Sequence, residues 1–156
     1  MLFKDENPKS VIKQITIFFH ASFIFQIIFF IVSLYIVNRF GELSRFDEQQ
    51  ISIIKYLIIF LVLIIIPGGD YLTRSRIKSI NPEIKVIDKI IFYRTAFFIK
   101  LALLELIDII TIIVYLLTGG RSFLLIIGIL LLYFLLNSPS AKKIALLLNI
   151  NPRELE

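Results

Sequence analysis

Residues 14–38 of the chain read QITIFFHASFIFQIIFFIVSLYIVN and contain no Asp, Glu, Lys or Arg. A helix needs about 20 mostly apolar residues to cross the hydrocarbon core of a membrane. This stretch is long enough, and it is longer than the apolar core of a signal peptide, which has about 7–15 residues. We therefore predict a retained transmembrane helix over residues 14–38.

The composition of the whole chain indicates that this helix is not the only one. Of its 156 residues, 58% are hydrophobic, against about 45–50% in soluble globular proteins. A domain of this size cannot hide so much apolar surface from water in a single core. The sequence therefore predicts an all-α integral membrane protein, and it argues against a soluble enzyme and against nucleic acid as a partner.

The remaining apolar stretches predict three further spans, at about residues 51–67, 93–117 and 122–138. Pro67-Gly68-Gly69 predicts that the second helix weakens or breaks there, because proline and glycine disfavour a helix interior. We expect Asp70 to cap or turn the chain at the membrane edge. Gly119-Gly120 predicts a tight turn between the third and fourth spans. Together the four spans form one membrane domain over residues 1–156.

The distribution of basic residues predicts how the four spans are oriented. Twelve of them flank the ends of the spans on the side of both termini: Lys4, Lys9, Lys13, Arg74, Arg76, Lys78, Lys85, Lys89, Arg94, Lys142, Lys143 and Arg153. Only four lie on or near the other side: Arg39, Arg45, Lys55 and Arg121. Lys and Arg are enriched in cytoplasmic flanks. We therefore expect a cell (inner) membrane protein with both termini in the cytoplasm.

Two cytoplasmic segments, residues 70–92 and 139–156, show amphipathic patterns. Asn81-Pro82-Glu83 predicts a helix start, followed by Ile84, Ile87 and Ile91 on one face of a loop helix that runs into the third span. Ser138-Pro139 predicts a second start, followed by Ile144, Leu147 and Leu148 on one face. We expect both helices to lie on the membrane surface, where basic side chains contact anionic lipid headgroups: Arg74, Arg76, Lys78, Lys85, Lys89, Lys142 and Lys143.

The third span contains three charged residues, Lys100, Glu105 and Asp108. A charge at the centre of a bilayer costs about 3 kcal/mol on insertion scales, so each of these must be compensated. At about 100° per residue, Lys100 and Asp108 share an arc of about 80° with Thr111, Tyr115 and Thr118, and Glu105 lies at its edge. We expect this stripe to face the interior of the helix bundle. Gln26 in the first span has a matching depth, so we expect the first and third spans to face each other with Gln26 near Glu105 and Asp108.

Two interpretations of this polar cluster remain open. In the structural one, Lys100, Glu105 and Asp108 neutralise one another, and the stripe holds helices or subunits together. In the functional one, a carboxylate in a low-dielectric environment changes its charge near neutral pH and serves as a proton or cation site.

The residue types that are missing limit the function further. The chain has no cysteine and a single histidine, so we expect no disulfide, no metal and no cofactor site. No catalytic motif is present, and we do not expect an enzyme. The sequence predicts an accessory, assembly or interaction subunit of a membrane complex, which binds another membrane protein or itself. The alternative is a small ion- or proton-coupled transporter or channel, homo-oligomeric, that uses Glu105 and Asp108.

Overall fold

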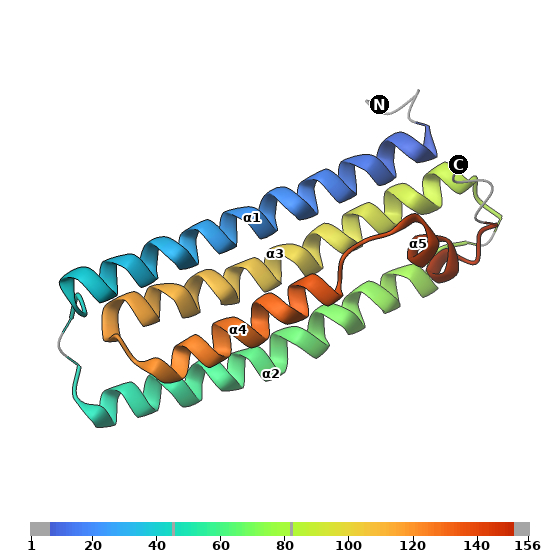
Figure 1. Ribbon diagram of the computed structural model, residues 1–156. Coiled ribbons are helices and arrows are strands. Elements are labelled where there is room, and N and C mark those ends of the chain that lie inside the picture. The colour runs from blue at the N-terminus through green and yellow to red at the C-terminus, as the bar shows by residue number, and fades with distance from the viewer. Residues whose placement is uncertain (1–6, 45, 82, 152–156) are drawn as a thin grey trace.

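The computed structural model describes residues 7–44, 46–81 and 83–151, so Lys4, Arg45, Pro82 and Arg153 of the predictions above lie outside it. The described residues form helices and no strands. The elements are α1 (Pro8–Phe40), α2 (Glu48–Lys78), α3 (Val86–Thr118), α4 (Arg121–Leu136) and α5 (Ala141–Leu148). Successive long helices alternate in direction. The α1–α2 and α3–α4 connections therefore lie at one end, and the start of α1 and all of α5 lie at the other (Figure 1).

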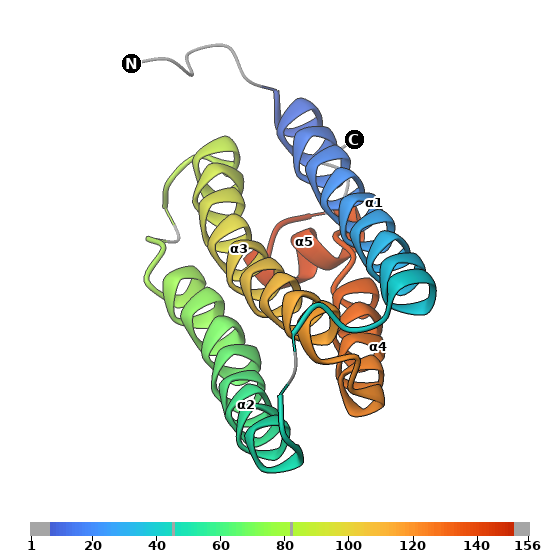
Figure 2. The ribbon, with the colours of Figure 1, turned by 90° about the vertical axis from the view of Figure 1, so that its left-hand side faces the viewer.

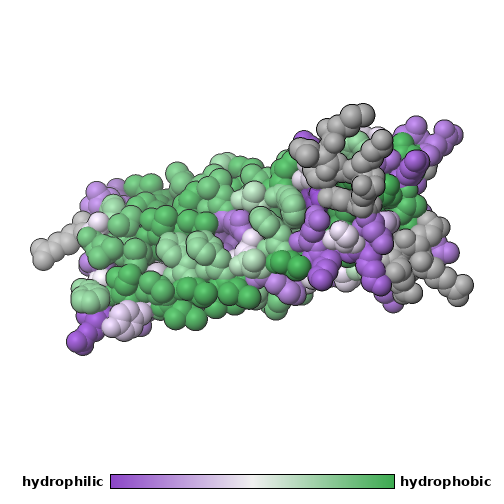
Figure 3. Space-filling model, turned by 90° about the horizontal axis from the view of Figure 1, so that it is seen from above, coloured by the Kyte–Doolittle hydropathy of each residue, from purple (hydrophilic) through white to green (hydrophobic). Residues whose placement is uncertain are grey.

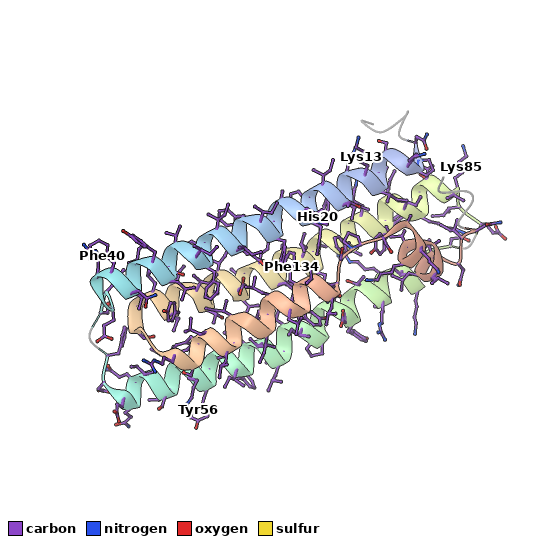
Figure 4. All side chains as sticks on the ribbon, viewed as in Figure 1. Lys13, His20, Phe40, Tyr56, Lys85 and Phe134 are labelled. Carbon is purple, nitrogen blue, oxygen red and sulfur yellow. The ribbon has the colours of Figure 1, made fainter. Side chains whose placement is uncertain are left out.

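We call these the far end and the basic end. The basic end is defined by the described residues Lys9, Lys13, Arg74, Arg76, Lys78, Lys85, Lys89, Arg94, Lys142 and Lys143. The helix directions place the N-termini of α1 and α3 and the C-terminus of α2 there (Figure 1). Lys13 and Lys85 both lie at this end, whereas Phe40 lies at the far end (Figure 4).

α3 is the central helix of the bundle. It packs against α1, α2 and α4, and Figure 2 shows α1 and α2 on different sides of it. Thirteen of its 33 residues are buried, whereas α2 buries only Ile58 and Gly69. α3 therefore supplies more buried side chains than any other helix, whereas most residues of α2 face outward.

The register between α1 and α3 is set by three contacts. Arg94 donates a hydrogen bond of 2.9 Å to Gln14, the rings of Phe18 and Phe98 lie 4.7 Å apart, and those of Phe19 and Phe97 lie 6.4 Å apart. The two helices run in parallel (Figure 1), so each α1 residue is level with the α3 residue about 79 positions later. The prediction that these two helices face each other is confirmed.

The prediction that the second helix breaks at Pro67 is wrong, because α2 continues as one helix to Lys78. Pro67 lies on the exposed side of the helix. Gly69 is on the buried side, and a Cβ there would lie 3.3 Å from Cγ of Lys100. The close packing that glycine allows against α3 offsets its weak helix propensity. Asp70 is consequently an interior residue of α2 and not a cap or turn.

The predicted loop helix does run into the third span, but it starts later than the predicted start at Asn81-Pro82-Glu83. α3 begins at Val86 and runs without interruption to Thr118, so Ile84 precedes it and Ile87 and Ile91 belong to its first turns. The side chain of Asn81 accepts a hydrogen bond of 3.0 Å from the backbone N–H of Glu83. That bond closes a turn, the common alternative to an N-cap for an Asn side chain.

α5 starts at Ala141, slightly later than predicted, with Ser140 accepting a bond of 3.3 Å from the N–H of Lys143. Its buried face consists of Ile144, Ala145 and Leu148, which join the apolar cluster that α1 and α3 form at the basic end. Leu147 stays exposed. The expectation that the apolar face of this helix lies on the membrane surface is therefore wrong, because protein covers it.

Hydrophobic and hydrophilic side chains occupy different parts of the surface along the length of the molecule (Figure 3). Hydrophobic side chains cover most of the face in Figure 3, and hydrophilic ones gather at the basic end, with smaller groups at the far end and midway along the face. By length and composition, α1 and α2 are apolar enough to cross a membrane, and α4 with α5 makes a third candidate if this pair, bent by 75°, counts as one span. Two or three candidate spans are consistent with membrane association.

Candidate functional site

A polar network joins three helices where the hydrophobic surface gives way to the basic end. Nζ of Lys100 on α3 lies 2.5 Å from Oδ1 of Asp70 on α2, and it also donates to Oδ1 of Asn137, which follows α4. The hydroxyl of Tyr133 donates to Oδ2 of Asp70 over 2.8 Å. The side-chain amide of Asn137 donates to the carbonyl of Tyr133 over 2.8 Å. We call these four residues the Lys100 network.

The network corrects the expectation that Lys100, Glu105 and Asp108 neutralise one another. Lys100 is compensated by Asp70, and neither carboxylate oxygen of Asp108 has a hydrogen-bond partner among the described residues. Sequence reasoning missed Asp70 because the predicted helix break placed it outside the second span. The signal that was available is chemical: a buried lysine needs a counter-charge, and Asp70 is the acid that follows the apolar part of α2 most closely.

The predicted stripe on α3 lies in the interior of the bundle. Lys100, Asp108, Thr111, Tyr115 and Thr118 are all buried. The hydroxyls of Thr111 and Thr118 donate to carbonyls of their own helix, those of Ile107 and Val114. These two threonines are thus satisfied within α3 and leave no donor for another helix.

Glu105 lies apart from the stripe and is only half-buried. It is about 60° around α3 from the exposed residue Ala102, on the side of Phe98, whose ring contacts Phe18 of α1. Its carboxylate forms no hydrogen bond or ion pair with the part of the chain that the structure describes. Glu105 therefore lies at the edge between the interior and the outer surface of α3.

Gln26 and Asp108 are the buried polar side chains without hydrogen bonds among the described residues. Gln26 is 0% and Asp108 is 2% exposed. The register of α1 and α3 places Gln26 level with Glu105 and within about one helical turn of Asp108. Buried polar groups are almost always hydrogen-bonded, and an unsatisfied one costs about 1–3 kcal/mol.

A cavity of about 260 Å³ opens beside the Lys100 network and we call it the basic-end cavity. Its lining includes charged side chains from three helices, Asp70 and Arg74 of α2, Lys100 of α3 and Lys143 of α5, together with the ring of Tyr93. Lys143 is anchored at its edge, because its Nζ donates to the carbonyls of Leu136 and Ser138 over 3.3 and 3.0 Å.

The described residues contain no group of three or more His, Cys, Asp or Glu side chains that could hold a metal ion. His20, the one histidine of the chain, is exposed on α1, midway along the helix (Figure 4). The candidate site therefore consists of the Lys100 network, the carboxylate of Asp108 without a hydrogen bond among the described residues, and the basic-end cavity.

Comparison with known proteins gave no match to any family model, to any curated protein or to any solved structure.

Proposed function

We propose that four helices span the membrane and that the Lys100 network marks one boundary of its hydrocarbon core. Three helices extend from this level to the far end over about 27–29 Å each: His20 to Asn38, Asp70 to Ile51, and Lys100 to Thr118. This distance approaches the thickness of a hydrocarbon core, about 30 Å. The hydrophobic surface in Figure 3 supports this placement. α4 is short because it ends at the network.

The basic end faces the cytoplasm in this proposal, since basic residues favour that side. Both termini are then cytoplasmic and the protein belongs to the cell (inner) membrane. The basic end projects beyond the hydrocarbon core, where its Lys and Arg side chains are near anionic headgroups of the lipid bilayer.

The absence of cysteine from the sequence makes the topology directly testable. Glu42 at the far end and Lys85 at the basic end are both exposed, so each can be replaced by a single cysteine. A maleimide that does not cross membranes is expected to label the Glu42→Cys protein in intact cells. It should label the Lys85→Cys protein only after permeabilisation. Labelling of Lys85→Cys in intact cells would contradict the orientation.

Within the membrane, we propose that the chain is an interaction subunit that binds a transmembrane helix of another membrane protein. The observation that carries this proposal is the half-buried Glu105, which has no partner among the described residues. A carboxylate at the edge of a lipid-facing surface costs several kcal/mol unless another group compensates it. A basic or hydrogen-bond-donating side chain on a neighbouring helix supplies that compensation.

The surface beside Glu105 suits a helix. Exposed residues recur along α3 every three or four positions from Phe92 to Leu106, the spacing of a helix–helix seam, and one more follows two turns later: Phe92, Thr95, Ile99, Ala102, Leu106 and Ile113. Small and hydroxylated residues in a seam let helices approach closely. Ala102 lies at its middle and Thr95 nearer the basic end. We call this set the α3 seam.

A bulky side chain in the α3 seam, or loss of the Glu105 carboxylate beside it, is expected to release the bound protein. We expect Ala102→Phe and Glu105→Leu to abolish its co-purification in mild detergent, as measured by mass spectrometry of the eluate. Gly128→Phe is the matched control, because Gly128 is exposed on α4 and a Cβ there meets nothing within 4 Å. A wild-type chain that elutes as a lone monomer would contradict the proposal. If the wild-type chain elutes as a dimer without another protein, and Ala102→Phe abolishes that dimer, then the bound helix belongs to a second copy of this chain.

A second candidate function rests on the unsatisfied Gln26 and Asp108. A buried carboxylate without hydrogen bonds is a place where a proton or cation could bind in a small transporter or channel, with several copies enclosing the pathway. Three cavities among the described residues lie toward the basic end, and Gln26, Glu105 and Asp108 line none of them. For this reason we place the interaction subunit first.

A further inference from the structure

We propose that the basic-end cavity is a binding site for a phosphate group. Its charged lining comes from three helices that are far apart in sequence, with Arg74 on α2, Lys100 on α3 and Lys143 on α5. Arg74 presents five N–H donors in a planar fork that matches phosphate oxygens. Lys143 is oriented by its bonds to the carbonyls of Leu136 and Ser138.

Asp70 also lines the cavity, and its charge is already compensated. Its Oδ1 is paired with Lys100 and its Oδ2 accepts the hydrogen bond from Tyr133. Arg74 and Lys143 therefore leave the lining with a net positive charge. An anion that enters contacts these two side chains without displacing Lys100 from the network.

The size and position of the cavity define the class of ligand. At about 260 Å³ it is smaller than the sites that hold drug-sized ligands, about 300–1,000 Å³, and suits a headgroup or an inorganic ion. In the proposed membrane placement it opens at the level of the lipid headgroups. Recognition of a lipid phosphate rests on that placement, whereas recognition of free phosphate does not.

The test uses the full-length protein in neutral detergent, where the surface potential of a bilayer is absent. Phosphatidic acid, phosphatidylglycerol or phosphatidylcholine is added, and retained lipid is counted by native mass spectrometry. A separate arm measures the shift in thermal unfolding with inorganic phosphate. The pocket variant is Arg74→Gln with Lys143→Gln. The control is Lys85→Gln with Lys142→Gln, which makes the same charge change at exposed sites outside this cavity.

We expect one anionic phospholipid per chain, with affinity about 30-fold lower in the pocket variant and unchanged in the control, which is the upper end of the effect of two exposed ion pairs. A phosphate-dependent thermal shift without lipid retention assigns the site to free phosphate and counts against the membrane placement, not against the cavity. Equal losses in the two variants would overturn the proposal, as would retention of phosphatidylcholine equal to that of the anionic lipids.

Discussion

Replacing Asp70 by Asn is expected to destabilise the protein by about 2–4 kcal/mol, and by more than replacing Lys100 by Met does. The side chain of Lys100 is 10% exposed, whereas that of Asp70 is 38% exposed. Removing one member of a buried ion pair leaves the other as an uncompensated charge, at a cost of about 3–5 kcal/mol when both are fully buried. Asp70→Asn isolates the more buried charge, and Lys100→Met isolates the more exposed one.

The measurement is reversible unfolding of the protein in mixed detergent micelles, monitored by circular dichroism. The double variant Asp70→Asn with Lys100→Met is the control, because it leaves no isolated charge. It should recover most of the stability lost in Asp70→Asn, since apolar replacement of a whole ion pair is often neutral or stabilising. Equal losses in the two single variants would contradict the predicted difference between them, and additive losses in the double variant would show that the ion pair contributes little.

The sequence predicted the helical class and the inward face of α3 for a clear physical reason. Long apolar runs identify membrane helices, and the period of a helix sets which residues share a face. The burial of Lys100, Asp108 and Thr111 follows from that period alone. That Gln26 of α1 lies level with Glu105 of α3 could be predicted as well, because α1 and α3 rise by the same amount per residue.

The pairing of charges could not be predicted in the same way. Proline and glycine lower helix propensity, but packing against a neighbouring helix outweighs propensity. Whether the chain turns at Pro67 depends on α3, a contact that local sequence does not report. Because α2 continues past Pro67, Asp70 pairs with Lys100. The predicted neutralisation of Lys100 by Glu105 and Asp108 is therefore not what the structure contains. For α5 likewise, an amphipathic pattern shows which face is apolar and not whether lipid or protein covers it.

Replacing Gln26 by Met is expected to stabilise the protein by about 1–3 kcal/mol, and Asp108→Leu is expected to have a similar effect. Both residues bury polar atoms that have no hydrogen bond among the described residues, and each such atom retains a desolvation penalty. Methionine and leucine remove those atoms and keep roughly the same shape. Thr111→Val is the matched control: it is equally buried, but its hydroxyl donates to Ile107 over 2.7 Å. Its substitution should give no gain.

The same variants separate the two proposed functions. An interaction subunit needs neither Gln26 nor Asp108, so the stabilised variants should still capture the bound protein, and wild-type proteoliposomes should show no proton or cation flux. A transporter requires the opposite: flux in the wild type that Asp108→Asn and Glu105→Gln abolish. Destabilisation by Gln26→Met would mean that water or an ion already satisfies this side chain, because the substitution would then remove a real hydrogen bond. That result would favour transport over assembly, and with it a pathway that leads to Asp108.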